Sequence, residues 1–227
     1  GIDIASLEIT LSSDTWSWNG SARRPVVTVK DGDKVLTRAV SIGSGIGEYY
    51  LTYPAEGEVG TVYLEIKGML DYYGEIVVPY SIVPPNVTGL KAENVTEDGV
   101  TLTWDESHGA TYYRISLYDE ADDTFYFRWT SEEPMLVLDG LNGGESYTFR
   151  VRAYAEIDGV TYMARGSSDE LEITIPVTDP CAEGEHQFDE EQIPASCENP
   201  GTLKHTCSVC GYSYTEIITD AIGHKVV

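Results

Sequence analysis

The segment Gly99-Val-Thr-Leu-Thr-Trp104 decides the fold of the central part of this 227-residue chain. Apolar and polar side chains alternate along it, so one face is apolar and the other polar. This period of two predicts a half-buried antiparallel strand. A second stretch, residues 141–153, alternates in the same way from Tyr147 onward. Turn-prone residues such as Asn142-Gly-Gly144 separate these runs, and short strands with frequent turns predict a β-sandwich.

Residues 84–177 resemble a fibronectin type III domain. The resemblance rests on Trp104 in its strand and on the pattern Leu-x5-Tyr-x-Phe-x-Val-x-Ala between Leu141 and Ala153. It implies that Trp104 fills the gap between two sheets. It also implies that Tyr147 packs at a corner, with its hydroxyl bonded back to the backbone. Display and binding are the functions that such a domain implies.

Residues 1–83 show the same alternation, and Asp31-Gly32 predicts a tight hairpin between two of the strands. The predicted strands are residues 7–11, 26–29, 49–53, 59–66 and 75–82. The pattern Pro-x-Val-x-Val-x-Asp-Gly, from Pro25 to Gly32, resembles an immunoglobulin-like repeat of surface proteins in Gram-positive bacteria. That resemblance implies a second sandwich that serves as part of a stalk.

Residues 178–227 hold all 4 cysteines, spaced Cys181-x15-Cys197-x9-Cys207-x2-Cys210, with Gly211 next. A Cys-x2-Cys-Gly turn directs two thiolates at one point, which supplies half of the tetrahedral shell that zinc prefers. The flanking runs 202–206 and 212–218 predict the two strands that this turn joins.

The whole C-terminal segment resembles a short repeat of bacterial surface proteins, through motifs such as His186-x-Phe188 and Cys207-x-x-Cys210-Gly. The resemblance implies that each repeat supplies one His and three Cys. The implied zinc ligands are His186, Cys197, Cys207 and Cys210, and His224 would open the next repeat. If residues 198–201 form a tight turn, however, Cys197 lies roughly 16 Å from the Cys-x2-Cys turn. Cys181 is then the alternative ligand.

Two other states of the cysteines stay open at this point. An exported protein meets an oxidising environment, in which four cysteines allow three disulfide pairings. The cysteines could also remain as thiols. Structural zinc is our preferred interpretation, and it is the only cofactor that the sequence suggests.

Charge excludes some partners, because 14 Lys and Arg stand against 38 Asp and Glu, a net charge of −24. Such a surface repels nucleic acid and anionic lipid and keeps neighbouring copies apart. No run of eighteen apolar residues is present, so we expect no membrane insertion. The densest acidic cluster, residues 119–123, lacks the regular spacing of a calcium loop and predicts an exposed hairpin turn.

No set of catalytic residues stands out. His108 lies beside Glu106 and Ser107, but the partners of a catalytic triad converge from distant segments. We therefore expect His108 to be a solvated loop residue and the chain not to be an enzyme.

These observations together predict an all-β chain. Two tandem β-sandwiches, immunoglobulin-like (1–83) and then fibronectin type III (84–177), precede a small Cys-rich β-hairpin unit (178–227). Because Gly1 directly precedes strand-like sequence, we expect a fragment of a longer, secreted or cell-surface bacterial protein. Its predicted role is a spacer and binding scaffold for a protein or glycan outside the cell. The alternative is a set of accessory modules of a secreted carbohydrate-active enzyme or peptidase whose catalytic domain lies outside this fragment.

Overall fold

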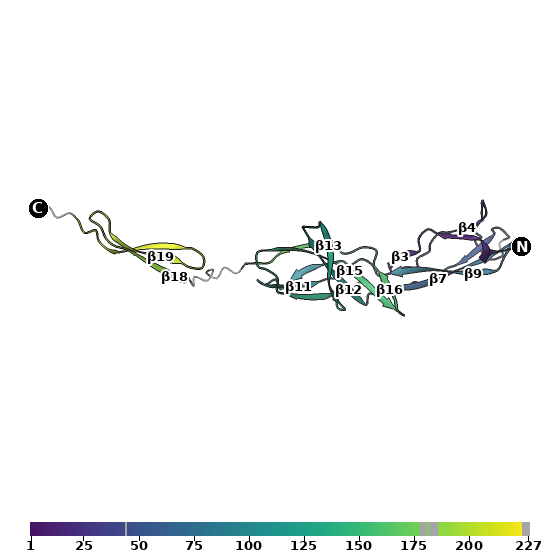
Figure 1. The fold of residues 1–227 in the computed structure, drawn as a ribbon. Coiled ribbons are helices and arrows are strands. Elements are labelled where there is room, and N and C mark those ends of the chain that lie inside the picture. Colours follow the sequence, from purple (N-terminus) through teal and green to yellow (C-terminus); the bar gives the residue numbers. More distant parts are fainter. Residues whose placement is uncertain (44, 178–180, 182–185, 224–227) are drawn as a thin grey trace. The chain divides into compact units, whose positions relative to one another are not determined.

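The computed structural model describes residues 1–43, 45–177, 181 and 186–223, and it confirms the all-β prediction (Figure 1). Apart from a three-residue 3-10 helix, Ile4–Ser6, every regular element of the described residues is a β-strand. The chain divides into two compact units, Gly1–Ile175 and Pro176–Val227. Within the described residues, no helix has the length and apolar character that crossing a membrane would require.

The N-terminal part of the first unit is a sandwich of two sheets. One sheet has the order β2-β4-β5, formed by Glu8–Leu11, Val27–Asp31 and Lys34–Val35. The other has the order β3-β9-β7-β6, formed by Thr15–Ser17, Glu75–Val83, Gly60–Gly68 and Tyr49–Thr52. The short strands β1 (Ile2–Asp3) and β8 (Tyr72–Tyr73) pair separately. Alternate residues of both sheets, among them Val29 and Leu64, point inward and form the core.

The predicted hairpin at Asp31-Gly32 is confirmed. Asp31 at the end of β4 pairs with Lys34 at the start of β5. Gly32 in the turn has a φ of +59°. Glycine adopts this left-handed conformation without the steric cost that a Cβ atom would add.

The second sandwich follows in the same unit. Its smaller sheet has the order β10-β11-β14, formed by Lys91–Glu93, Gly99–Thr103 and Met135–Asp139. Its larger sheet has the order β13-β12-β15-β16, formed by Thr124–Ser131, Tyr112–Asp119, Ser146–Ile157 and Val160–Met163. A further strand, β17 (Leu171–Thr174), also pairs with β15.

Trp104 and Tyr147 occupy the predicted places in this sandwich. Trp104 directly follows β11, is 6% exposed, and meets the ring of Tyr113 edge-on at 5.3 Å between centroids. The hydroxyl of Tyr147 accepts a hydrogen bond from the backbone N–H of Asn142 at 3.0 Å. The predicted corner is therefore confirmed, and both aromatic rings belong to one core.

The acidic cluster 119–123 begins at the last residue of β12, and residues 120–123 form the predicted exposed turn between β12 and β13. The hydroxyl of Tyr126 donates to the carboxylate of Asp122 at 2.8 Å. Within the part of the chain that the structure describes, these acids belong to no group of side chains arranged to hold a metal.

The two sandwiches meet in a packed junction within the first unit. Val59 and Val83 of the first sandwich pack against Ala155 and Tyr162 of the second, and all four are buried. The hydroxyls of Thr61 and Tyr162 lie 2.7 Å apart across this contact. The junction therefore has an apolar core of its own with a hydrogen bond beside it.

His108 lies in an exposed turn, as expected, but it also contacts the first sandwich at this junction. Its ring stacks on Trp18 of the first sandwich, with 3.7 Å between centroids, and its Nε2 lies 2.6 Å from a carboxylate oxygen of Glu58. Its side chain is 41% exposed. The sequence did not reveal this role because Trp18 and Glu58 come from distant parts of the chain.

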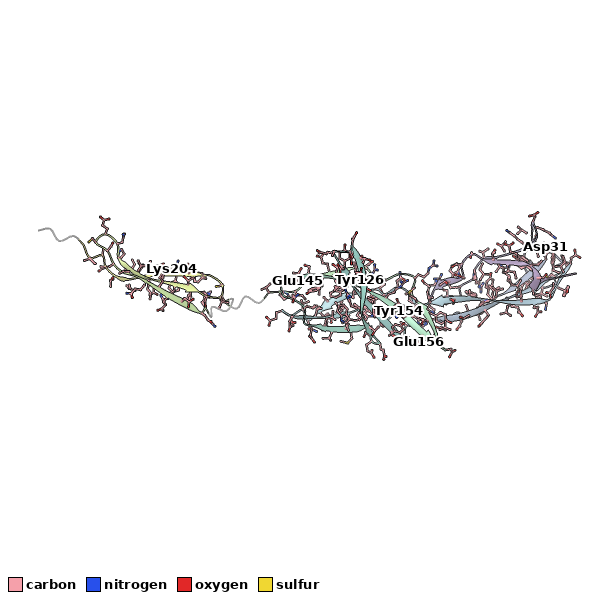
Figure 2. All side chains as sticks on the ribbon, viewed as in Figure 1. Asp31, Tyr126, Glu145, Tyr154, Glu156 and Lys204 are labelled. Carbon is pink, nitrogen blue, oxygen red and sulfur yellow. The ribbon has the colours of Figure 1, made fainter. Side chains whose placement is uncertain are left out.

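The C-terminal unit is a three-stranded antiparallel sheet. Its order is β18-β19-β20, formed by Phe188–Ile193, Gly201–Cys207 and Ser213–Thr219. The strands β19 and β20 correspond to the predicted pair, and β18 was not predicted as a strand. Lys204 lies on the middle strand (Figure 2). Among the described residues of this unit, Cys181 and Cys207 are the only buried apolar side chains.

Candidate metal centre

The turn between β19 and β20 shapes the first half of the candidate site. The backbone N–H of Gly211 donates to the carbonyl of Cys207 at 3.0 Å, and the N–H of Cys207 donates to the carbonyl of Tyr212 at 2.8 Å. Gly211 has a φ of +75°. This left-handed residue reverses the chain directly after Cys210, so that both cysteines of the turn face the same side.

Strand pairing brings His186 to the same end of the sheet. Phe188 of β18 lies directly opposite Cys207 of β19, and His186 precedes it by two residues. Both the N–H and the hydroxyl of Ser208 donate to the carbonyl of Gln187, at 2.9 and 3.1 Å. The imidazole of His186 also stacks on Tyr212, with 5.0 Å between centroids. The histidine is therefore held by its neighbours on both sides.

Cys181 completes a cluster of four metal-ligating side chains. One ligand atom from each of Cys181, His186, Cys207 and Cys210 lies within 4.8 Å of those of the others. The Sγ atoms of Cys181 and Cys207 are 3.6 Å apart, and Sγ of Cys210 is 3.4 Å from Nδ1 of His186. Cys181 and Cys207 are buried, His186 is half-buried and Cys210 is exposed.

These separations match the edges of a zinc coordination shell. With Zn–S distances of about 2.3 Å and Zn–N distances of about 2.0 Å, a tetrahedron has S···S edges of about 3.8 Å and S···N edges of about 3.5 Å. The 3.6 Å between the two sulfurs is far longer than the ~2.05 Å of a disulfide bond. The four side chains could therefore hold a metal ion such as zinc.

The thiols of the cluster differ in their tendency to ionise. Backbone N–H groups of Cys210 and Val209 point at Cys207 and lower the pKa of its thiol to about 6. Burial raises the pKa of Cys181 to about 12, and the hydrogen bonds and charges of Cys210 and Cys207 add to this effect. The surroundings of Cys207 therefore favour the thiolate that a metal ion would need, whereas those of Cys181 favour the protonated thiol.

The structure brings together three of the four ligands that the resemblance implied and places Cys197 elsewhere. Cys197 is exposed in the turn between β18 and β19, where its carbonyl accepts from the N–H of Gly223. It precedes the Gly201 end of β19, and Cys207 lies at the opposite end. The alternative ligand, Cys181, occupies the remaining position in the cluster. His224 lies outside the described residues.

An aromatic group that the sequence did not reveal supports the cluster. His205 of β19 is 8% exposed, stacks on Tyr214 with 4.5 Å between centroids, and meets Phe188 edge-on at 5.9 Å. These three side chains come from three adjacent strands. They share one face because each lies directly opposite, or diagonal to, its neighbour in the ladder.

Comparison with known families identifies one domain. Residues 84–162 match the fibronectin type III domain family. The chain therefore carries this domain within an all-β, multidomain arrangement, as a modular protein does. No curated protein matches the chain.

Several solved structures are similar to part of the chain. The fibronectin type III domain of human collagen alpha-1(XX) is 25% identical, covers 43% of this chain and 89% of its own, and has a TM-score of 0.33. A protein named FN3tt is 26% identical, covers 38% and 96%, and has a TM-score of 0.30. A titin fragment of several domains is 18% identical, covers 75% and 66%, and has a TM-score of 0.35.

Proposed function

We propose that this chain is a non-catalytic spacer and binding scaffold of a secreted or cell-surface bacterial protein. The observation that carries the proposal is the packed junction between the two sandwiches. A buried apolar group, the Thr61–Tyr162 hydrogen bond and the stack of His108 on Trp18 all cross it. In addition, Nη1 of Arg165 donates to the carbonyl of Thr15 at 3.1 Å. A spacer needs such a junction, because tandem domains otherwise move independently.

The C-terminal unit contributes a third module, which we propose is held together by zinc. With so few buried side chains, a unit of this size needs a staple beyond its own core. Three cysteines and one histidine converge in the cluster, whereas disulfides consume cysteines in pairs. Cys181, His186, Cys207 and Cys210 would hold the ion, whose role is to stabilise the fold.

A substitution at Gly109 tests the packing of the junction. A Cβ atom at Gly109 would lie 2.7 Å from Cγ2 of Val59, and the residue has a φ of +72°. We expect Gly109→Ala to open the junction, because Val59 is buried and cannot move aside without disturbing its neighbours. NMR relaxation would then report two sandwiches that tumble independently, whereas in the wild type they tumble as one body.

Gly140→Ala is the matched control for this variant. Gly140 has a similar φ of +78°, but nothing lies within 4 Å of its Cβ position. Both variants bear the left-handed strain of about 1 kcal/mol, and only Gly109→Ala adds the overlap. If Gly109→Ala tumbles as one body like Gly140→Ala, the junction does not hold the sandwiches together and the spacer proposal loses its support.

We also propose that this chain catalyses no reaction. The histidines of the described residues are engaged in the junction or in the C-terminal aromatic and cysteine groups. A general base needs a nucleophile within hydrogen-bond reach, and the cysteine–histidine pair of the described residues, Cys210 and His186, belongs to the cluster that we assign to zinc. We expect no turnover in a panel of glycosidase, esterase and peptidase substrates. Turnover that a single substitution in this chain abolishes would contradict the proposal.

A further inference from the structure

The arginines of this acidic chain make no ion pairs among the described residues, although three of the lysines do. Lys34, Lys67 and Lys91 each contact a glutamate. The guanidinium groups of six arginines lie instead over aromatic rings (Arg23, Arg24, Arg38, Arg114, Arg128 and Arg150). A guanidinium stacked on a ring still has its N–H edge available to a carboxylate.

Two of these arginines, Arg114 and Arg150, lie on the outer face of the larger sheet in the second sandwich. We define this outer face by Tyr112 and Arg114 of β12, Phe125 and Phe127 of β13, and Arg150 and Tyr154 of β15. The residues between them, such as Ile115, Phe149 and Val151, point into the core and are buried. Because successive side chains of a strand alternate between faces, the named residues point to solvent.

Aromatic rings and guanidinium groups alternate across the outer face. The guanidinium carbon of Arg114 lies 4.8 Å from the ring centre of Tyr154 and 5.0 Å from that of Phe127. Tyr154 stacks in turn on Tyr112, with 5.1 Å between centroids. The guanidinium of Arg150 lies 4.0 Å above the ring of Phe125. The face therefore carries two groups of stacked aromatic and guanidinium side chains, one around Arg114 and one around Arg150.

Two arginines of this face have different partners. Arg114 lies directly opposite Arg152 in the ladder, where like charges destabilise a strand pair. Nε and Nη2 of Arg152 donate to the carbonyls of Ala164 and Arg165 at 2.8 and 3.1 Å, so Arg114 and Arg150 are the guanidinium groups that a ligand could engage. Residues 84–177 contain 6 Lys and Arg against 18 Asp and Glu, so carboxylates that could pair with the arginines are abundant in this domain. No carboxylate among the described residues forms an ion pair with either arginine. Charge complementarity therefore points to a ligand that brings carboxylates of its own.

The rest of the face indicates the class of that ligand. Strands β12 and β15 are paired on both sides, so a peptide strand could add to this sheet at the edge strand β13 but not beside Arg114 and Arg150 in the middle. Flat aromatic rings offer an apolar surface to the C–H faces of a sugar, and guanidinium groups recognise carboxylates bidentately. We infer that the outer face binds a linear polysaccharide that contains uronic acids.

The extent of the site follows from its borders. Glu156 follows Tyr154 on the same face of β15 (Figure 2), and the hydroxyl of Tyr118 donates to Asp123 at the other end. Acids at both ends would repel carboxylates placed there, so the favourable contacts of the ligand's carboxylates fall in the middle, around Arg114 and Arg150. This inference rests on the proposed scaffold function and names the ligand class for it.

The test is a calorimetric titration of the whole chain with an oligogalacturonate of about six residues, at roughly 20 mM and roughly 0.5 M salt. The fully methyl-esterified oligomer is the matched neutral probe, because it keeps the sugar rings and loses the charge. We expect the acid to bind at low salt and the ester not to bind. We expect Arg114→Ala and Arg150→Ala each to weaken binding about tenfold or more, as the loss of a charged hydrogen bond does.

Arg38→Ala is the matched variant for this experiment. It also removes an arginine that lies over a tyrosine, Tyr53, but it does so in the first sandwich. We expect its affinity to stay within about twofold of wild type. If Arg114→Ala proves unstable, Arg114→Lys tests the same position. It keeps the charge and loses the planar guanidinium group, so we expect its affinity to lie between those of the wild type and a variant without the charge.

Three results would overturn the inference: equal binding of the ester, equal loss in Arg38→Ala and Arg114→Ala, or tighter binding of hexaglutamate than of the uronate. Each would leave the proposed function standing, because the chain could still display another ligand. Catalytic turnover would contradict the proposed function, and it would do so whether or not uronates bind.

Discussion

Chelation of the metal is expected to unfold the C-terminal unit and to leave both sandwiches intact. The described part of this unit buries few side chains apart from Cys181, His205 and Cys207, so its stability should come from the metal. Where a site forms only on folding, the free energy of metal binding is available as folding free energy. Circular dichroism and NMR should show loss of the signals of β18, β19 and β20 on addition of a strong chelator. They should show recovery on addition of zinc.

The control for chelation is a reducing agent, which breaks disulfides and leaves zinc thiolates intact. We expect a reductant to change nothing in the spectrum of the C-terminal unit. If the reductant unfolds the unit and the chelator does not, disulfides hold it and the zinc proposal is wrong.

Trp104→Ala should have the second large effect, a loss of about 3 to 5 kcal/mol in the free energy of unfolding of the second sandwich. Trp104 is 6% exposed and meets Tyr113 edge-on in the core, so truncation leaves a cavity between two sheets. Denaturant unfolding followed by NMR would measure the change for this sandwich separately. A loss below about 1 kcal/mol would show that the ring contributes little to the core.

Two substitutions serve as comparisons for Trp104→Ala. Phe127→Ala removes an aromatic ring that is 49% exposed on the outer strand, and it should cost much less. The indole Nε1 of Trp104 is buried and has no hydrogen-bond partner among the described residues. Trp104→Phe removes that donor and keeps an aromatic ring, so it should cost less than Trp104→Ala.

The period of two in the sequence predicted most of the fold. The alternation at residues 99–104 placed the strand before Trp104, and Asp31-Gly32 placed the β4–β5 hairpin. The strand β18 was missed because its residues Asp189, Glu190 and Glu191 carry charge on both faces. A strand in a single-layer sheet buries little on either face, so the alternation that indicates a strand is absent.

The candidate site was only partly predictable, for a reason of geometry. Cys207 and Cys210 are joined by a short turn, so their spacing fixes their proximity. Cys197 and Cys181 are both distant in sequence from this turn. Which of them lies near it depends on the direction of β19. The strand carries Cys197 away from the cluster, as the length of the strand in the sequence indicated and the resemblance to a surface repeat did not, and Cys181 is the alternative ligand that the sequence analysis named. The role of His108 also depends on contacts between separate sandwiches.

Native mass spectrometry of the whole chain tests the central claim most directly, with Cys181→Ser and Cys197→Ser compared. The claim is that the C-terminal module of this scaffold folds around zinc held by Cys181, His186, Cys207 and Cys210. We predict one zinc ion per chain in the wild type and in Cys197→Ser, and its loss in Cys181→Ser. Retention of zinc in Cys181→Ser with loss in Cys197→Ser would contradict the ligand set. A metal-free chain whose mass shows paired cysteines would contradict the claim itself.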